Sequence, residues 1–299
     1  MSVGSFMHFI RKPLAEKRAT IRFFARKELS KLPYLPIHVR IAVTAGENIH
    51  FWWSCFTMAY HSDRSLLDYW GDDLGELRFL WQYLSPGKIF FDIGSYHGIF
   101  SVLAAKKLAS HGQVVAFEPS RRERRRFKIH IRLNGLKKIR VEPYAVSSTD
   151  GALTFFTVAS GFTSMNSLKK PMIECPLLEN TVDSISLDRY LSERKITQID
   201  LMKIDIEGGE LAAFRGATGM LSTIRPILIC EVLDWVTQPW GYPARDIVRF
   251  LEQHDYDWFD FWDDGTISPH AQRDEYPEIR NYLAVPREKL ALVERWRRA

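Results

Sequence analysis

Three acidic residues, each at the end of a short apolar stretch, could bind a ligand that resembles a nucleoside. Asp92 follows Phe90 and Phe91, Glu118 ends the stretch 114–118, and Asp205 ends the stretch 199–205. Such stretches are typical of buried strands, and parallel strands bring their carboxyl ends to one edge of a sheet. An acid after the second strand suits the diol of a ribose. The pattern predicts a nucleoside-binding enzyme.

The turn after Asp92 narrows the choice of ligand. Gly94 and Gly98 bracket it and a helical pattern begins at Ile99, so the helix N–H groups would face the ligand. The dinucleotide fingerprint G-x-G-x-x-G is absent because Tyr96 replaces its middle glycine, and no P-loop G-K-[ST] follows. Asp92 would repel a pyrophosphate but suits a ligand with a positive amino group. The combination matches S-adenosylmethionine.

The elements around these acids alternate between strand and helix from residue 88 onward, as in an α/β, doubly wound, mostly parallel sheet with helices on both faces. The predicted helices cover 99–108, 121–133, 210–221 and 244–254, and the further strands cover 139–144, 153–158, 181–185, 227–231, 257–262 and 281–285. Before them we predict a helix that begins at Pro13, a β-hairpin over 38–43 and 48–52, and a helix over 74–84. Residues 1–84 are therefore predicted to form a basic helix-and-hairpin appendage, and residues 85–299 the main domain.

The composition is typical of a globular chain that resides in a reducing compartment. The 299 residues are 46% hydrophobic and 26% charged, and no apolar run is long enough to span a bilayer. Cys55, Cys175 and Cys230 are odd in number and far apart, which argues against a disulfide framework. We expect a cytoplasmic protein, and the sequence does not indicate its oligomeric state.

Positive charge is concentrated in two places. Residues 1–40 contain nine Lys or Arg against two Glu, and residues 121–126 contain five Arg. We hypothesise that residues 1–36 contact an anionic membrane surface, although packing on the main domain is the plainer interpretation. Neither a basic groove with interleaved aromatic residues nor a known nucleic-acid motif accompanies this charge, which argues against a nucleic-acid partner.

Taken together, the motifs resemble the FkbM-type S-adenosylmethionine-dependent methyltransferases, which mostly act on hydroxyl groups. The resemblance covers about residues 85–286 and implies a Rossmann-like class I methyltransferase fold with a seven-stranded sheet. The matching segments are 91–98, 116–119, 134–135, 145–147, 186–188, 203–210, 225–226 and Glu231.

The resemblance also implies roles for residues in the cofactor site. A loop of Asp92, Gly94, Ser95 and Gly98 would hold the cofactor. Glu118, followed by Pro119, would bind the ribose hydroxyls, and the segment with Ala145 and Val146 would flank the adenine. The structural alternative is a tight strand-to-helix turn without a ligand.

Methyl transfer to an alcohol requires a base, because an unactivated hydroxyl is a very weak acid. Asp205 is the preferred candidate for this base and Glu207 the second, while Lys203 could orient the acceptor. Glu207 could instead cap the following helix, and His97 is a less favoured base. A divalent cation is possible chemically but is not indicated, because Asp205, Glu207, Glu231 and Asp234 have no dedicated ligand spacing.

The predicted acceptor is a small molecule or glycan: a hydroxyl of a sugar, a glycan precursor or a natural product. Trp235, Trp240 and Tyr242 form an aromatic loop that could stack on a ring or simply pack. Three alternatives remain open: an RNA methyltransferase that uses the basic clusters, a non-catalytic scaffold, and a nucleotide-dependent oxidoreductase that the first turn disfavours.

Overall fold

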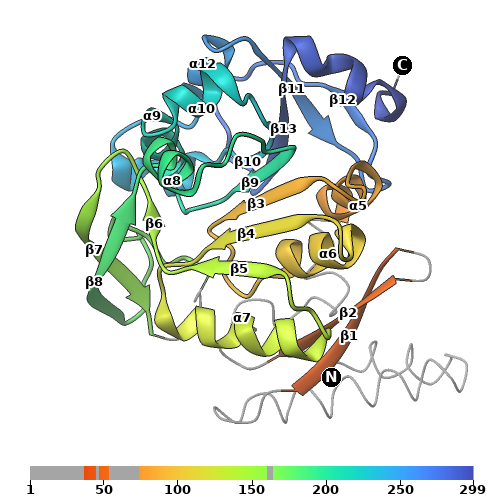
Figure 1. The fold of residues 1–299 in the computed structure, drawn as a ribbon. Helices are drawn as coiled ribbons and strands as arrows, with labels where there is room; N and C mark the ends of the chain where they lie inside the picture. The colour runs from red at the N-terminus through yellow and green to blue at the C-terminus, as the bar shows by residue number, and fades with distance from the viewer. Residues whose placement is uncertain (1–36, 45–46, 54–73, 160–163, 299) are drawn as a thin grey trace, which may run out of the picture.

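The computed structural model describes residues 37–44, 47–53, 74–159 and 164–298 (Figure 1). The predicted basic helix that begins at Pro13 and the tip of the predicted hairpin lie outside the described residues. The hairpin itself is confirmed, because β1 (Ile37–Thr44) and β2 (Glu47–Trp53) pair antiparallel. It lies beside α7 (Arg121–Leu133) in Figure 1.

The main sheet confirms the predicted α/β, doubly wound arrangement. Within the described part of the chain it has eight strands in the order β12-β11-β13-β10-β9-β3-β4-β5. Their bounds are β3 Ile89–Ile93, β4 Gln113–Phe117, β5 Ile139–Glu142, β9 Leu201–Ile204, β10 Ile227–Glu231, β11 Tyr256–Phe261, β12 Ile267–Pro269 and β13 Asn281–Pro286. Strands β5, β4, β3, β9 and β10 are parallel, and β13, β11 and β12 are antiparallel. The count exceeds the expected seven because the short β12 extends the edge.

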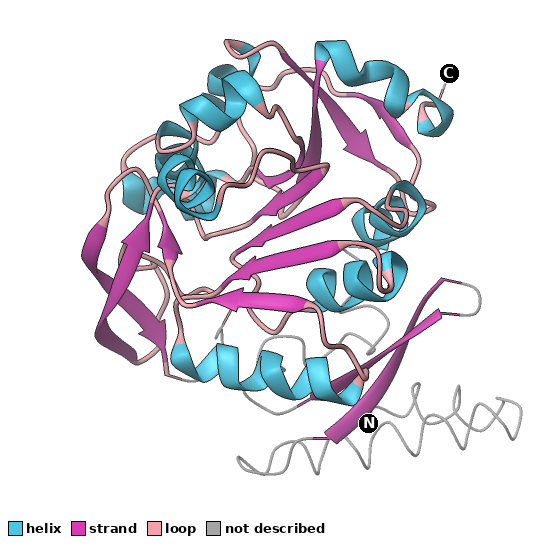
Figure 2. Cartoon of the chain, in the orientation of Figure 1, coloured by secondary structure: helices cyan, strands magenta, loops and turns pink. Residues whose placement is uncertain are grey.

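Alternate residues of the central strands enter two separate cores, one on each face of the sheet. Phe90 belongs to the core under α5 (Leu74–Tyr83) and α6 (Ile99–Leu108), whereas the next residue, Phe91, belongs to the opposite core. Since side chains alternate along a strand, a strand that is buried on both faces is apolar throughout. The opposite core is covered by α8 (Leu187–Arg194), α9 (Glu210–Arg215), α10 (Thr218–Thr223) and α12 (Arg245–Glu252), as the colours of Figure 2 help to follow.

Two predicted elements differ from those observed. The helix predicted over 210–221 is divided into α9 and α10, because the chain leaves helical geometry at Ala217. A Cβ on Gly216 would lie only 2.5 Å from the carbonyl oxygen of Ser147, so the backbone approaches a neighbouring loop at this break. The strand predicted over 181–185 begins earlier, at Leu177. The sequence does not indicate its first half, because these residues are exposed and show no buried apolar pattern.

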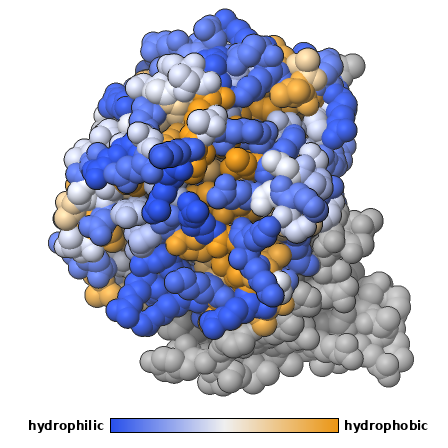
Figure 3. All heavy atoms as spheres, viewed as in Figure 1, coloured by the Kyte–Doolittle hydropathy of each residue, from blue (hydrophilic) through white to orange (hydrophobic). Residues whose placement is uncertain are grey.

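A three-stranded sheet lies beyond the carboxyl ends of β4 and β5 (Figure 1). It contains β6 (Ala145–Val146), β8 (Leu177–Ile185) and β7 (Gly151–Val158). From the viewpoint of Figure 3, hydrophobic side chains gather over the middle of the molecule and hydrophilic ones surround them. Among the described helices, none has the length and apolar character that a bilayer span requires.

Candidate active site

A cavity lies where β3, β4 and β9 end, between the main sheet and the three-stranded sheet. Its empty volume is about 540 Å³, including the part open to solvent. The residues that line it and were expected from the sequence to form the site are Gly94, Glu118, Pro119, Ala145, Val146, Asp205 and Glu207. Segments far apart in the sequence therefore meet at the predicted edge of the sheet.

The turn after β3 is built so that its backbone lies close to β9. Gly94 has φ +80°, and a Cβ there would overlap the carbonyl oxygen of Asp205. The N–H groups of Gly94 and Ser95 both donate to the carbonyl oxygen of Phe117, at 3.0 and 2.9 Å. Gly98, with φ +79°, begins α6 and leaves space for the ring of Phe127. Ser95 and Gly98 shape the turn and do not line the cavity.

Glu118 is a buried carboxylate at the cavity wall. Its Oε2 accepts the N–H of Tyr96 at 2.9 Å, and its Oε1 accepts that of Ser120 at 2.7 Å. Burial, and then the negative charge of Glu123, raise the pKa of Glu118 to about 8 despite these bonds. A carboxylate oxygen can accept more than one hydrogen bond. Glu118 can therefore also accept two hydroxyl groups, which fits a ribose diol.

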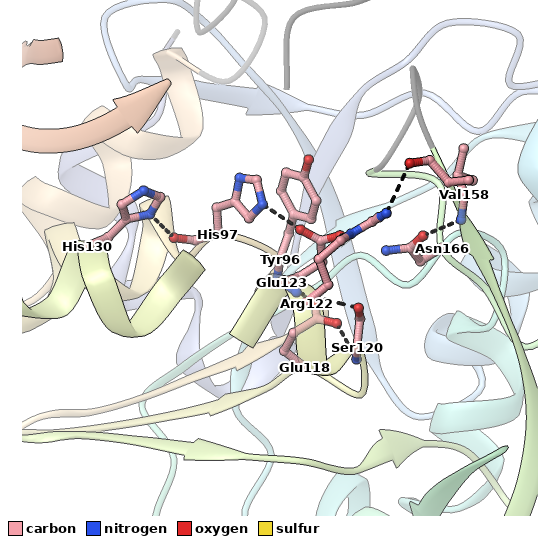
Figure 4. Close-up of polar contacts among 10 residues, drawn as sticks. Tyr96, His97, Glu118, Ser120, Arg122, Glu123, His130, Val158 and Asn166 are labelled. Atoms are coloured by element: carbon pink, nitrogen blue, oxygen red, sulfur yellow. Dashed lines mark hydrogen bonds and ion pairs between the residues drawn. The ribbon is translucent and has the colours of Figure 1, made fainter. Parts of the chain in front are cut away.

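A buried histidine supports this turn from behind (Figure 4). His97 Nε2 lies 2.6 Å from Oε2 of Glu123, whose Oε1 accepts from Arg122 Nε at 2.5 Å. The carbonyl oxygen of His97 contacts His130 Nδ1 at 2.7 Å, and the ring of Tyr96 stacks on that of His97. Burial lowers the pKa of His97. Burial alone would raise the pKa of Glu123, but its contacts with His97 and Arg122 lower it. Because His97 does not line the cavity, its position suits support of the turn.

Asp92 and Lys203 lie beneath the cavity, opposite one another on β3 and β9. Asp92 Oδ2 accepts from Ser101 Oγ at 2.6 Å, and burial raises the pKa of Asp92 although Lys203 opposes this shift. Lys203 Nζ lies 2.6 Å from Oδ2 of Asp205 and 4.7 Å from the centre of the Phe100 ring. Of this set, only Asp205 reaches the cavity.

Glu207 follows Asp205 in an unusual backbone conformation, with φ +56°. Its carbonyl oxygen accepts from Ser167 Oγ at 3.0 Å and from Trp240 Nε1 at 3.1 Å. Burial, and the charges of Asp205 and Glu210, raise the pKa of Glu207 well above its ordinary value. The predicted helix-capping role of Glu207 is not observed, because α9 has no side-chain cap. Glu210 instead holds the turn before the helix, since its Oε1 accepts the N–H of Ile206 at 2.8 Å.

The other acids considered as cation ligands are placed differently. Asp234 ties two loops together, since its carboxylate oxygens accept the N–H groups of Ala244 and Tyr276 at 2.9 and 2.5 Å. Glu231 is buried, and burial together with the charge of Asp205 raises its pKa well above the ordinary value. Among the residues that the structure describes, no group of three or more His, Cys, Asp or Glu side chains is arranged to hold a metal ion.

Several lining residues were not predicted from the sequence. Tyr96, Phe155 and Leu168 line the cavity together with Trp240, which the sequence suggests only as part of an aromatic loop. Asn166 also lines the cavity, and its Oδ1 accepts the N–H of Val158 at 2.8 Å, which ties it to the end of β7 (Figure 4). These contacts depend on how β7 folds back, and no local motif announces them.

Several solved structures are similar to part of this chain. No curated protein matches the chain significantly. Among solved structures, an rRNA methylase from Streptococcus thermophilus is similar over 71% of this chain and 93% of its own, with 10% identity and a TM-score of 0.41. An O-methyltransferase from Bacillus cereus is similar over 76% of this chain and 84% of its own, with 15% identity and a TM-score of 0.40. A precorrin-6y C5,15-methyltransferase from Geobacter metallireducens is similar over 71% of this chain and 86% of its own, with 12% identity and a TM-score of 0.40.

A sequence-family model matches more than half of the chain. It covers residues 92–258, from Asp92 near the end of β3 to the first half of β11. The family is described as the methyltransferase FkbM domain, the family that the motifs resemble. The chain belongs to the FkbM methyltransferase domain family.

Proposed function

We propose that this protein is an S-adenosylmethionine-dependent O-methyltransferase that acts on a hydroxyl of a sugar, a glycan precursor or a natural product. The observation that carries the proposal is that Glu118 and Asp205 line one cavity. Glu118 is suited to bind a ribose diol, and Asp205 is suited to remove the proton of an acceptor hydroxyl. When bound, S-adenosylmethionine would supply a methyl group on a positively charged sulfur.

The residues around the cavity fit this cofactor. Glu118 has capacity for two hydroxyl donors, and Gly94 brings the backbone of the turn to the cavity wall. Ala145, Val146 and Phe155 provide an apolar wall that suits a flat base. In this assignment Asp92 supports the turn from beneath the cavity, because its carboxyl group accepts a hydrogen bond from Ser101 and interacts with the charge of Lys203.

Asp205 is better suited than Glu207 to remove the proton of the acceptor hydroxyl. A general base must be ionised, and burial and nearby negative charge, which raise the pKa of Glu207, disfavour its ionised form. Asp205 is partly exposed to the cavity and contacts the ammonium group of Lys203. Lys203 itself is buried and does not line the cavity, so we assign it the role of orienting Asp205.

An assay of methyl transfer tests the proposal. The purified protein would be incubated with S-adenosylmethionine labelled in its methyl group and with hydroxylated acceptors. We expect label in the acceptor with wild type and a rate at least about 100-fold lower with Asp205→Asn. Label that enters RNA while every hydroxylated small molecule stays unlabelled would favour the RNA methyltransferase alternative.

We also propose, from the cysteine usage and the charge of the sequence, that the protein acts in the cytoplasm and contacts anionic membranes through residues 1–36. Co-sedimentation with vesicles that contain phosphatidylserine tests the contact. Replacing Arg22, Arg26 and Lys27 with Glu in the full chain should abolish pelleting, and unchanged pelleting would contradict it.

A further inference from the structure

A second, smaller cavity adjoins the candidate active site. Its empty volume is about 250 Å³, including space open to solvent, and it lies between the segment 165–172 and the loop 235–240. Glu207 and Trp240 line both cavities. A ring held in the smaller cavity therefore lies next to Glu207 and Trp240, which also line the larger cavity where Asp205 is found.

Large apolar side chains are exposed in this cavity. Trp235 is 40% exposed and Met172 is 45% exposed, and both line it together with Pro239. Single exposed apolar residues are common on protein surfaces, but adjacent ones in a cavity often mark a binding site. An exposed indole offers a flat surface on which a ring can lie.

The cavity is held in shape by bonds from its own loop. Trp240 Nε1 donates to the carbonyl oxygen of Glu207, and the hydroxyl of Tyr242 contacts the carbonyl oxygen of Gly208 at 2.5 Å. A Cβ on Gly209 would lie 3.1 Å from the ring of Trp240, so this ring packs closely against the turn. Tyr242 and Trp240 therefore fix the loop, whereas Trp235 is left available to a ligand.

Charged groups flank the apolar surface. The ammonium group of Lys169 lies 5.9 Å from the centre of the Trp240 ring, and Glu207 lines both this cavity and the larger one. A wholly apolar ligand would leave such polar groups without hydrogen-bond partners. A sugar ring has an apolar face of C–H groups and hydroxyls around its edge, so it satisfies both kinds of surface.

We propose that this second cavity is the acceptor site and that it takes a sugar ring, whose apolar face lies on Trp235 and whose hydroxyls reach Lys169 and Glu207. The inference rests on the proposed function, because it names the acceptor class of the same site. It also separates Trp235, which touches the acceptor, from Trp240 and Tyr242, which position the loop.

Binding of simple glycosides tests this site. Methyl glycosides of glucose, galactose, mannose, rhamnose and fucose would be examined by saturation-transfer NMR with wild-type protein and S-adenosylhomocysteine. We expect saturation of at least one glycoside, about threefold to tenfold weaker binding with Trp235→Ala, and recovery with Trp235→Phe. Trp262→Ala is the matched control, because Trp262 is 46% exposed and lies at the β11–β12 turn.

Two results would overturn the sugar site: no glycoside is saturated by wild type, or binding is unchanged in Trp235→Ala. Catechol serves as a probe for a flat aromatic ligand. If catechol binds and its binding depends on Trp235, while no glycoside binds, the proposal that the ligand is a sugar is overturned. Each variant is also titrated with S-adenosylhomocysteine, which should bind equally well to all of them. If wild type fails this titration but binds glycosides through Trp235, the cofactor proposal fails and the ring site stands.

Discussion

Lys203 and Asp205 form an ion pair at the end of β9, with 2.6 Å between Nζ and Oδ2. The lysine side chain is 5% exposed and the aspartate side chain 27% exposed, so the cation is covered while the carboxylate reaches the cavity. Asp92 is the partner of the same lysine on the adjacent strand, and the charge of Lys203 opposes the rise in the pKa of Asp92 that burial causes. One buried ammonium group thus interacts with a carboxyl group under the turn and with a carboxylate at the cavity.

Replacing Asp205 with Asn should lower kcat at least about 100-fold, because the general base is lost while its shape is kept. Glu207→Gln should lower kcat much less, since burial and nearby negative charge, which raise the pKa of Glu207, disfavour the ionised form that a base needs. The matched control is Asp264→Asn, which removes a carboxylate that pairs with Arg298 at 2.8 Å far from the cavity. A larger loss of kcat in Glu207→Gln than in Asp205→Asn would reverse the assignment.

Gly94→Ala should destabilise the protein more than Gly87→Ala. Both glycines have positive φ, at +80° and +95°, and therefore both substitutions cost about 1–2 kcal/mol of backbone strain. Only the Cβ at residue 94 meets other atoms, which adds about 1–3 kcal/mol. Urea unfolding measures the difference, and equal losses in the two variants would show that the turn does not approach β9 this closely.

Binding of S-adenosylhomocysteine at pH 7 should release a proton from Glu118. The pKa of this group is about 8 without ligand, so it is mostly neutral, and two ribose hydroxyls would stabilise its ionised form. Calorimetry in phosphate and in Tris, which differ in ionisation enthalpy, should therefore give different binding heats. The difference should shrink in Glu118→Gln. Identical heats for wild type in the two buffers would contradict this assignment.

The His97–Glu123 pair should make stability fall as the pH falls. Both pKa values are lowered in the folded protein, so the unfolded chain binds protons more readily. The loss should begin below about pH 6.5 for His97 and continue below about pH 4.5 for Glu123, the ordinary values of these groups. One proton gives a slope of at most about 1.4 kcal/mol per pH unit.

Thermal unfolding between pH 5 and pH 8 checks this prediction. The raised pKa of Glu118 acts with the opposite sign, so the informative quantity is the difference between wild type and His97→Gln. The variant should show a flatter loss below pH 6.5. Parallel profiles would mean that His97 does not titrate in this range.

The sequence predicts the sheet edge well because apolar strands that end in acids are local signals. Asp92, Glu118 and Asp205 lie at that edge as expected. The sequence could not show that Asp92 and Lys203 lie beneath the cavity, because burial of a polar side chain depends on its neighbours across the sheet. Nor could it show that Phe155 and Trp240 join the wall, since long-range folding of β7 and of the segment after β10 brings them there.

The most direct test of the account is a calorimetric titration of S-adenosylhomocysteine into wild type, the Asp92→Ala, Glu118→Ala double variant and a Glu179→Ala control on the exposed part of β8. The account predicts roughly micromolar binding to wild type and to the control, about −8 kcal/mol, and no measurable binding to the double variant while it remains folded. A folded wild type that binds no S-adenosylhomocysteine, or a double variant that binds as tightly as wild type, would contradict the cofactor site.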